Sequence, residues 1–184
     1  MIVPMVYILP GGPNVPLKCP NRRNYIRITP DGNCLFRAMS HIITGSQMQH
    51  MEVRMAILAH LTTFSDLFVR FLDSTKYKLS DPNTAQTIQT YIATERMDKE
   101  GTWGTHIEIY GLVHLLNTAI FVYTDHCRCR NLRACTCPPT DWLKYSTSSI
   151  LGQMGIDSEE NGTAPAMYIY HPQRHFDVVR TIVK

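Results

Sequence analysis

The stretch Asp31-Gly32-Asn33-Cys34-Leu35-Phe36-Arg37-Ala38 places a cysteine where a turn gives way to an apolar helix. A thiol at a helix start lies near the positive end of the helix dipole and near unpaired backbone N–H groups, which favour the nucleophilic thiolate. Cys34 is therefore a candidate nucleophile. The backbone N–H groups of Gly32, Asn33 and Cys34 are candidates for an oxyanion hole. A buried structural cysteine is the alternative interpretation.

A second chemical motif, His175-Phe176-Asp177, lies near the other end of the chain. A thiol nucleophile needs an imidazole to take and return its proton, and a group that orients the imidazole. Residues two apart in a strand point to the same side, so His175 and Asp177 are predicted to project together. A carboxylate beside an imidazole selects its tautomer and stabilises the imidazolium. The pair is therefore a candidate base and orienting acid, although a lone strand histidine is more often structural.

The elements around Cys34 are predicted from turn residues and apolar spacing. Residues 25–29 alternate as in a short strand, and residues 30–33 have the composition of a turn. Helical spacing follows until Gly45 ends the first helix. A second helix is predicted to begin at Ser46, with Gln49 as its capping-box partner. Its apolar stripe, interpreted as ordinary core, consists of Met51, Met55, Leu58 and Leu61.

The rest of the chain predicts helices first and strands later. Residues 64–72 read as one or two helical turns. Asp81 and Pro82 are expected to begin a helix that runs to about Met97. A capping box, Thr105 to Glu108, opens a helix to Leu116. Strands are predicted at 119–124, 142–145, 167–170 and 176–183, and a loop at 157–162. The fold class is α+β, with a small, mostly antiparallel sheet flanked by helices.

Composition narrows the class of protein. At 184 residues, with 44% hydrophobic and 18% charged residues, the chain is long enough for one globular domain with a core. Residues 1–24 are expected to be an N-terminal arm and linker rather than a signal peptide, with a short signal-peptide core at residues 1–9 as the alternative, and residues 25–184 the domain itself. No membrane-spanning run occurs. The net charge of +3 comes without basic runs interleaved with aromatics, so we expect neither membrane nor nucleic acid as a partner.

Four of the six cysteines crowd into residues 127–137, which is unlike a disulfide framework spread along a fold. We therefore expect a reducing, intracellular location, cytoplasmic or nuclear, with one thiol kept free. The clustered residues are candidate zinc ligands: Cys127, Cys129, Cys135 and Cys137. Their Cys-x-Cys spacing is not the common zinc knuckle, so hairpin disulfides and free thiols on a solvated basic loop stay open as alternatives.

Four blocks of the sequence resemble, in order, the ovarian-tumour (OTU) domain cysteine proteases, most of which are deubiquitinases. The block around Cys34 is similar to the nucleophile motif of that family. Residues 103–109 resemble its Trp-Gly helix start, residues 120–123 the strand that follows, and residues 175–177 its terminal histidine segment. The resemblance covers about residues 25–180 and implies an OTU-like fold. Residues 126–140 depart from the family pattern and are interpreted as a Cys-rich insert.

By this resemblance Cys34 is the nucleophile and His175 the general base and acid. Asp177 matches the orienting acid or amide, and Asp31 a position that braces the loop before the cysteine or serves as the acid. On strand geometry we rank Asp177 first. Trp103 is expected to be a core anchor. Two further residues are expected to be structural or supporting, Glu108 as a capping carboxylate and His106.

The resemblance further implies hydrolysis of isopeptide bonds at the ubiquitin C-terminus through a thioester on Cys34. No cofactor is required, and structural zinc is an additional possibility. Ubiquitin or ubiquitin-like conjugates are the expected partners of a monomer. Two alternatives stay open from the sequence: a non-catalytic ubiquitin-binding domain, and a polyprotein-processing protease of a viral or transposable element.

Overall fold

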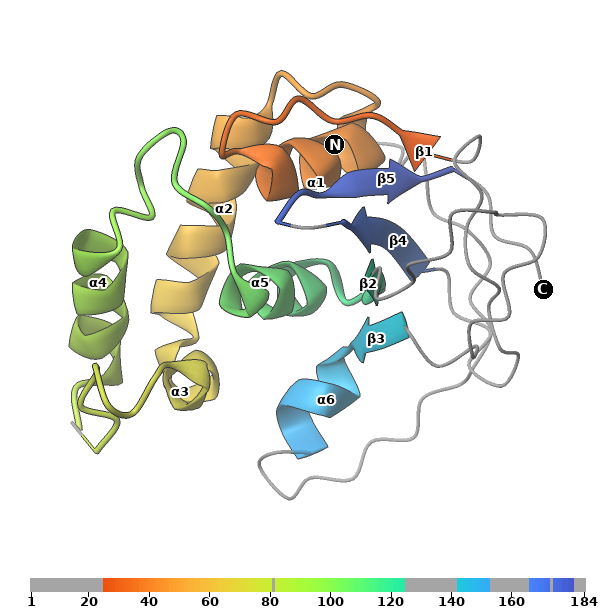
Figure 1. Ribbon diagram of the computed structural model, residues 1–184. Helices are drawn as coiled ribbons and strands as arrows, with labels where there is room; N and C mark the ends of the chain where they lie inside the picture. Colours follow the sequence, from red (N-terminus) through yellow and green to blue (C-terminus); the bar gives the residue numbers. More distant parts are fainter. Residues whose placement is uncertain (1–24, 81, 125–141, 153–165, 173, 181–184) are drawn as a thin grey trace.

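The computed structural model describes residues 25–80, 82–124, 142–152, 166–172 and 174–180. The predictions for residues 1–24, for the Cys-rich segment at 126–140 and for the loop at 157–162 lie outside these residues. In Figure 1 the strands lie one below another, with helices beside them. The described part is an α+β fold, as the sequence predicts.

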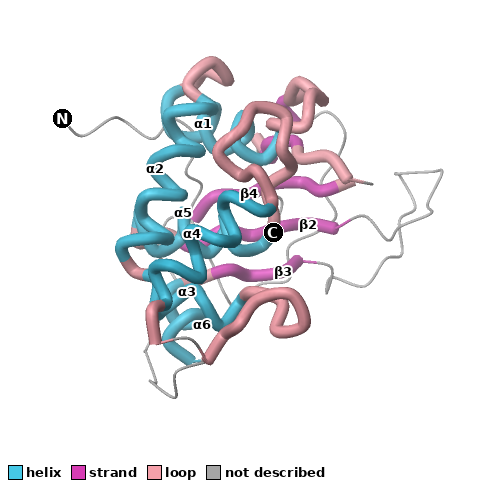
Figure 2. The backbone as a smooth tube through the Cα atoms, turned by 90° about the vertical axis from the view of Figure 1, so that its left-hand side faces the viewer, coloured by secondary structure: helices cyan, strands magenta, loops and turns pink. Residues whose placement is uncertain are grey.

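Helices gather to one side of the sheet in Figure 2. In the described part of the chain, no helix is long and apolar enough to cross a membrane. The helices, in chain order, are α1 (Cys34–Thr44), α2 (His50–Thr63), α3 (Ser65–Phe68), the 3-10 helix η2 (Val69–Phe71), α4 (Thr84–Thr94), α5 (His106–Leu116) and α6 (Thr147–Gly152).

The sheet has the strand order β1-β5-β4-β2-β3, so the first and last strands of the described chain are neighbours. The strands are β1 (Tyr25–Ile26), β2 (Ala119–Thr124), β3 (Trp142–Tyr145), β4 (Ala166–His171) and β5 (Asp177–Val179). Within the described residues, only the β2–β4 pair is parallel, whereas β1–β5, β4–β5 and β2–β3 are antiparallel. The predicted mostly antiparallel sheet is therefore confirmed.

Two predicted helix ends are confirmed in detail. Gly45 follows α1 in the left-handed conformation, with φ of 79°, and its N–H caps the carbonyl of His41. At the start of α5, the Thr105 hydroxyl accepts from the Ile107 N–H, and the Glu108 carboxylate accepts from the Thr105 N–H at 2.6 Å. Both ends depend on residues close in sequence, which is why the pattern predicted them.

The predicted start of α2 is wrong. Ser46 lies in the turn before the helix, where its carbonyl accepts from the hydroxyls of Ser40 and Thr44. The side chain of Gln49 accepts from Thr44 rather than capping. Met55 is also misplaced in the prediction, because it is 49% exposed. The buried stripe of α2 instead consists of His50, Arg54, Ile57, Leu58 and Leu61.

The predicted ends of α4 also require correction. The cap is Asn83, whose side chain accepts from the Gln86 N–H at 3.1 Å, so the helix begins after Pro82 instead of with it. It ends at Thr94, short of Met97. Helix α6 was not predicted, because its short polar sequence carries no apolar period.

The main core lies between the sheet and the helices. Helix α1 is central to this core. Five of its side chains are at most 1% exposed: Leu35, Phe36, Ala38, Met39 and Ile42. The α1 helix packs against β5, the α2 helix and the loop before α5. This packing places the N-terminus of α1 beside the start of β5.

Candidate active site

Cys34 is the first residue of α1 and is a free thiol, 7% exposed. The turn before it depends on Gly32, whose φ of 81° is a left-handed conformation that other residues adopt at a cost. A Cβ at Gly32 would also lie 2.2 Å from the carbonyl oxygen of Gly101. The glycine therefore permits both the turn and its close approach to a second loop.

His175 and Asp177 contact each other directly. The imidazole Nε2 lies 3.0 Å from Asp177 Oδ1, which also accepts from the Ile28 N–H at 2.9 Å. His175 precedes β5 in a turn closed by its N–H to the Pro172 carbonyl, with Arg174 at φ of 73°. The turn thus positions the imidazole of His175, and Asp177, the first residue of β5, orients it.

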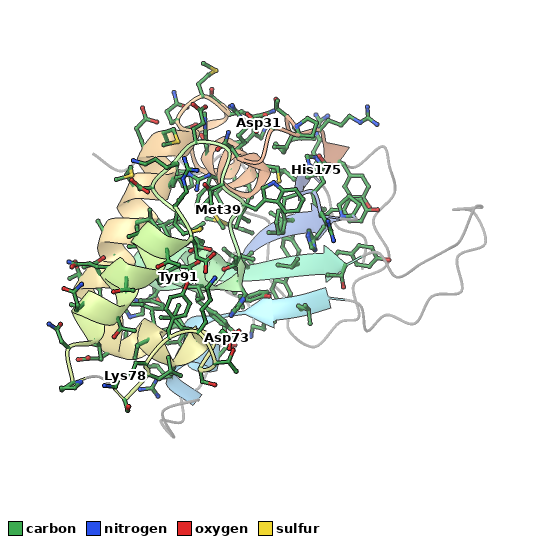
Figure 3. The ribbon with its side chains drawn as sticks, turned by 60° about the vertical axis from the view of Figure 1, so that its left-hand side comes forward. Asp31, Met39, Asp73, Lys78, Tyr91 and His175 are labelled. Carbon is green, nitrogen blue, oxygen red and sulfur yellow. The ribbon has the colours of Figure 1, made fainter. Side chains whose placement is uncertain are left out.

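The two halves of the candidate site meet at one end of the molecule. Figure 3 shows the His175 side chain and Asp31, from the loop before Cys34, at the same end. Arg174 and Phe176, the residues on either side of His175, line the same pocket as Cys34. The nitrogen Nδ1 of His175 is the one left for a proton from a thiol, since Nε2 faces Asp177.

Burial raises the pKa of the Cys34 thiol, and the charge of Asp31 adds to this effect. Backbone hydrogen bonds from Phe176, Leu35 and Cys34 lower the pKa but do not outweigh burial. The sequence expectation that the helix start favours the thiolate is therefore not met in this structure. The cysteine is a thiol that needs a base when it reacts.

Asp31 pairs with Arg37 and makes no hydrogen bond to His175 within the described residues. Its Oδ2 accepts from Arg37 Nε at 2.9 Å and from Nη2 at 2.6 Å, and its Oδ1 accepts from the Asn33 N–H at 3.1 Å. The Arg37 guanidinium holds the pKa of the Asp31 carboxyl far below its usual range. Asp31 is thus a permanent carboxylate that braces the loop before Cys34.

The three backbone candidates for an oxyanion hole differ in availability. The Asn33 N–H is engaged by Asp31, whereas the N–H groups of Gly32 and Cys34 donate to no other residue in the described part of the chain. The Asn33 side chain is buried, and its Oδ1 accepts from the Gly101 N–H at 2.7 Å. Asn33 therefore anchors the loop.

A residue missed from the sequence is Arg54, which lies fully buried in α2 and donates to Asn33 Oδ1 at 3.0 Å. Burial lowers the pKa of the Arg54 guanidinium. Nearby carboxylates raise the pKa in part, and the charge of Glu108 has the largest such effect. Position 54 lies on the same face of α2 as His50, Leu58 and Leu61. A charged residue on the apolar face of a predicted helix was therefore the feature of the sequence that could have identified Arg54.

A pocket of about 410 Å³ adjoins the thiol. Its lining includes Cys34, Trp103, His106, Leu143, His171 and Arg174. Trp103 is 53% exposed at this pocket, so the prediction of a core anchor is wrong. The physical reason is packing: Gly104 lies against the side chains of Leu35 and Phe36, which fill the core at that point.

The two residues expected to be structural differ in burial. Glu108 is fully buried and accepts from the Tyr91 hydroxyl at 2.8 Å as well as from Thr105. His106 is exposed, and its Nε2 lies 3.2 Å from the Phe71 carbonyl. Within the described part of the chain, no three His, Cys, Asp or Glu residues are grouped as a metal site. The four candidate zinc ligands lie outside it.

Known proteins resemble this chain in sequence and in fold. A sequence model of the family described as OTU-like cysteine protease matches residues 29–152. OTU domain-containing protein 5 of Rattus norvegicus is 26% identical over 149 residues, which are 81% of this chain and 20% of that protein. The chain thus spans about a fifth of the length of this curated relative.

Two solved viral structures share the fold. The OTU domain protease from Farallon virus has a TM-score of 0.61 and 21% identity, over 86% of this chain and 83% of that chain. The Hazara virus OTU bound to ubiquitin has a TM-score of 0.50 and 14% identity, over 87% and 81%. The family model matches more than half of the residues of this chain, so the chain belongs to the OTU-like cysteine protease family.

Proposed function

We propose that this protein is a thiol-dependent deubiquitinase that hydrolyses isopeptide bonds at the ubiquitin C-terminus. The observation that carries the proposal is the pairing of His175 with Asp177 at 3.0 Å, beside a buried free thiol at a helix start. Family membership supports cysteine protease chemistry, and the Hazara virus relative that binds ubiquitin supports the substrate class.

In the proposed acylation step, His175 Nδ1 takes the proton of the Cys34 thiol as the sulfur attacks the carbonyl carbon of the terminal ubiquitin glycine. In this step the N–H groups of Gly32 and Cys34 donate to the resulting oxyanion and stabilise it. Asp177 holds the imidazole and stabilises the imidazolium. When the C–N bond breaks, the imidazolium returns the proton to the departing lysine amine.

The second step releases the acyl group. Water attacks the thioester on Cys34 while His175 takes a proton from that water, and the thiolate leaves and is reprotonated by the imidazolium. The products are the free ubiquitin carboxylate and the regenerated enzyme. These steps use only the thiol, the imidazole, the carboxylate and backbone N–H groups, so the proposed mechanism requires no metal.

Ubiquitin with an electrophile at its C-terminus tests the proposal. We expect a covalent adduct with the wild-type protein and none with Cys34→Ala, because only the thiol forms the bond. Hydrolysis of a fluorogenic amide of ubiquitin should disappear in Cys34→Ala and in His175→Ala. Binding of ubiquitin without an adduct would instead indicate a ubiquitin-binding domain, and no engagement of any ubiquitin-like probe would exclude both functions.

A further inference from the structure

Arg54 is a buried cation whose guanidinium contacts two loops far apart in the sequence. The side chain is 0% exposed, and its Cζ lies 3.8 Å from the centroid of the Phe36 ring. Nη1 donates to the Met97 carbonyl at 2.8 Å, and Nη2 donates to the Thr102 carbonyl at 2.7 Å and to Asn33 Oδ1 at 3.0 Å. One side chain in α2 thus holds residues 31–33 and residues 97–104 together.

The two loops also contact each other directly. Asn33 Oδ1 accepts from the Gly101 N–H at 2.7 Å, in addition to its bond from Arg54. A Cβ at Gly32 would lie 2.2 Å from the Gly101 carbonyl oxygen, so the backbones are in van der Waals contact there. A change in the loop at 97–104 would therefore move the turn that precedes Cys34.

The hydrogen bonding of Arg54 is unlike that of a residue present for stability alone. Among the described residues, no carboxylate lies within ion-pair distance of its guanidinium, and Nε has no partner. Burying a charge without an ion pair is costly, and apolar residues of similar volume fill a core at least as well. Each bond that Arg54 does make ends on one of the two loops, which indicates a positional role.

We infer that Arg54 is a positioning residue that holds the turn before Cys34 against the loop at 97–104. The inference rests on the proposed function, in which the N–H groups of Gly32 and Cys34 face the developing oxyanion. Without the guanidinium, Asn33 Oδ1 keeps only its bond from the Gly101 N–H, and the turn gains freedom. The thiol itself stays in place, because it belongs to the first turn of α1.

The test compares Arg54→Met and Arg54→Lys with wild type, using Arg70→Met, an exposed arginine on η2, as the matched control. Methionine keeps the stem of the side chain, and lysine keeps the charge without the fork that reaches both loops. Three quantities are measured: kcat with a fluorogenic ubiquitin amide, alkylation of Cys34 by iodoacetamide, and hydrogen exchange of backbone amides. Alkylation needs the thiolate but no oxyanion hole, so it separates loop position from nucleophile integrity.

We expect Arg54→Met to lower kcat about 100-fold with little change in KM or in alkylation rate. Exchange at the Gly101 amide should rise at least about 10-fold while the amides of α5 keep their protection. Arg54→Lys should share both effects in weaker form, and Arg70→Met should show neither. Arg54→Met combined with Asn33→Ala should be no slower than the slower single variant, since both act through one loop.

Two results would overturn the inference. One is an unchanged kcat in Arg54→Met. The other is a parallel fall of kcat and alkylation with faster exchange throughout the chain, which would mean that Arg54 supports only the core. If wild type hydrolyses no ubiquitin substrate, the proposed function fails, and exchange at Gly101 still decides whether Arg54 anchors the loops.

Discussion

Asp177 is the carboxylate that contacts His175, whereas Asp31 is committed to Arg37. We therefore expect Asp177→Ala to lower kcat/KM about 100-fold or more, because the imidazole loses its orienting partner. Asp31→Ala should have the smaller effect, through a looser turn. Asp177→Asn, which keeps an oxygen for the Ile28 N–H, should retain more activity than Asp177→Ala. The reverse ranking of Asp31 and Asp177 in kcat/KM would refute this assignment.

The protonation of Cys34 gives a second residue-scale prediction. Because burial raises the pKa of the thiol, its neutral form dominates at neutral pH, and the thiolate fraction grows only as pH rises through that pKa. The rate of alkylation of the free protein by iodoacetamide should therefore keep rising above about pH 8.5, the ordinary range of a cysteine. A plateau already reached below pH 7 would show a preformed thiolate–imidazolium pair instead.

At the scale of elements, the turn before α1 is the sensitive point. Gly32 and Gly101 both have φ of 81°, but a Cβ would lie 2.2 Å from backbone at Gly32 and 3.8 Å from it at Gly101. Both alanine variants carry the cost of the left-handed conformation, and only Gly32→Ala adds a clash. We expect Gly32→Ala to lower the free energy of unfolding by about 1–3 kcal/mol more than Gly101→Ala does.

Urea denaturation of the two glycine variants measures this difference, and ubiquitin hydrolysis by the folded fraction shows whether the turn has moved. Equal stability of the two variants would mean that the loops separate at little cost. That result would also weaken the inference for Arg54, because the same two loops are involved.

Elements whose signals are local were predicted well. The capping box of α5, the glycine that ends α1 and the strand at 119–124 depend on neighbouring residues, so the sequence alone was sufficient. The start of α2 was mispredicted because Ser46 and Gln49 form hydrogen bonds to residues of α1. A capping pattern predicts a helix start only when no tertiary partner competes for the same side chains.

On the scale of the whole molecule, the site depends on the pairing of β5 with β1 and β4. Val178 is fully buried, and it pairs with Ile26 on one side and Ile169 on the other. Val178→Ala should lower the free energy of unfolding by about 2 kcal/mol through the cavity it leaves. The kcat of the protein that remains folded should stay close to wild type, because Asp177 keeps its hydrogen bonds.

Thermal or urea unfolding monitored by circular dichroism measures the effect of Val178→Ala. Val53→Ala, at a half-buried position of α2, is the control and should change stability less. If Val178→Ala lowered kcat without lowering stability, β5 would be a mobile part of the site rather than a fixed support.

The sequence by itself determined the candidate nucleophile, the candidate base, the fold class and most elements, since periodicity, turns and caps are local in the chain. The tertiary structure decided which carboxylate faces His175, why Trp103 lies at a pocket, and that Asn33 and Arg54 join two loops. These contacts link residues far apart in the sequence. They follow from the path of the folded chain, which no local pattern encodes.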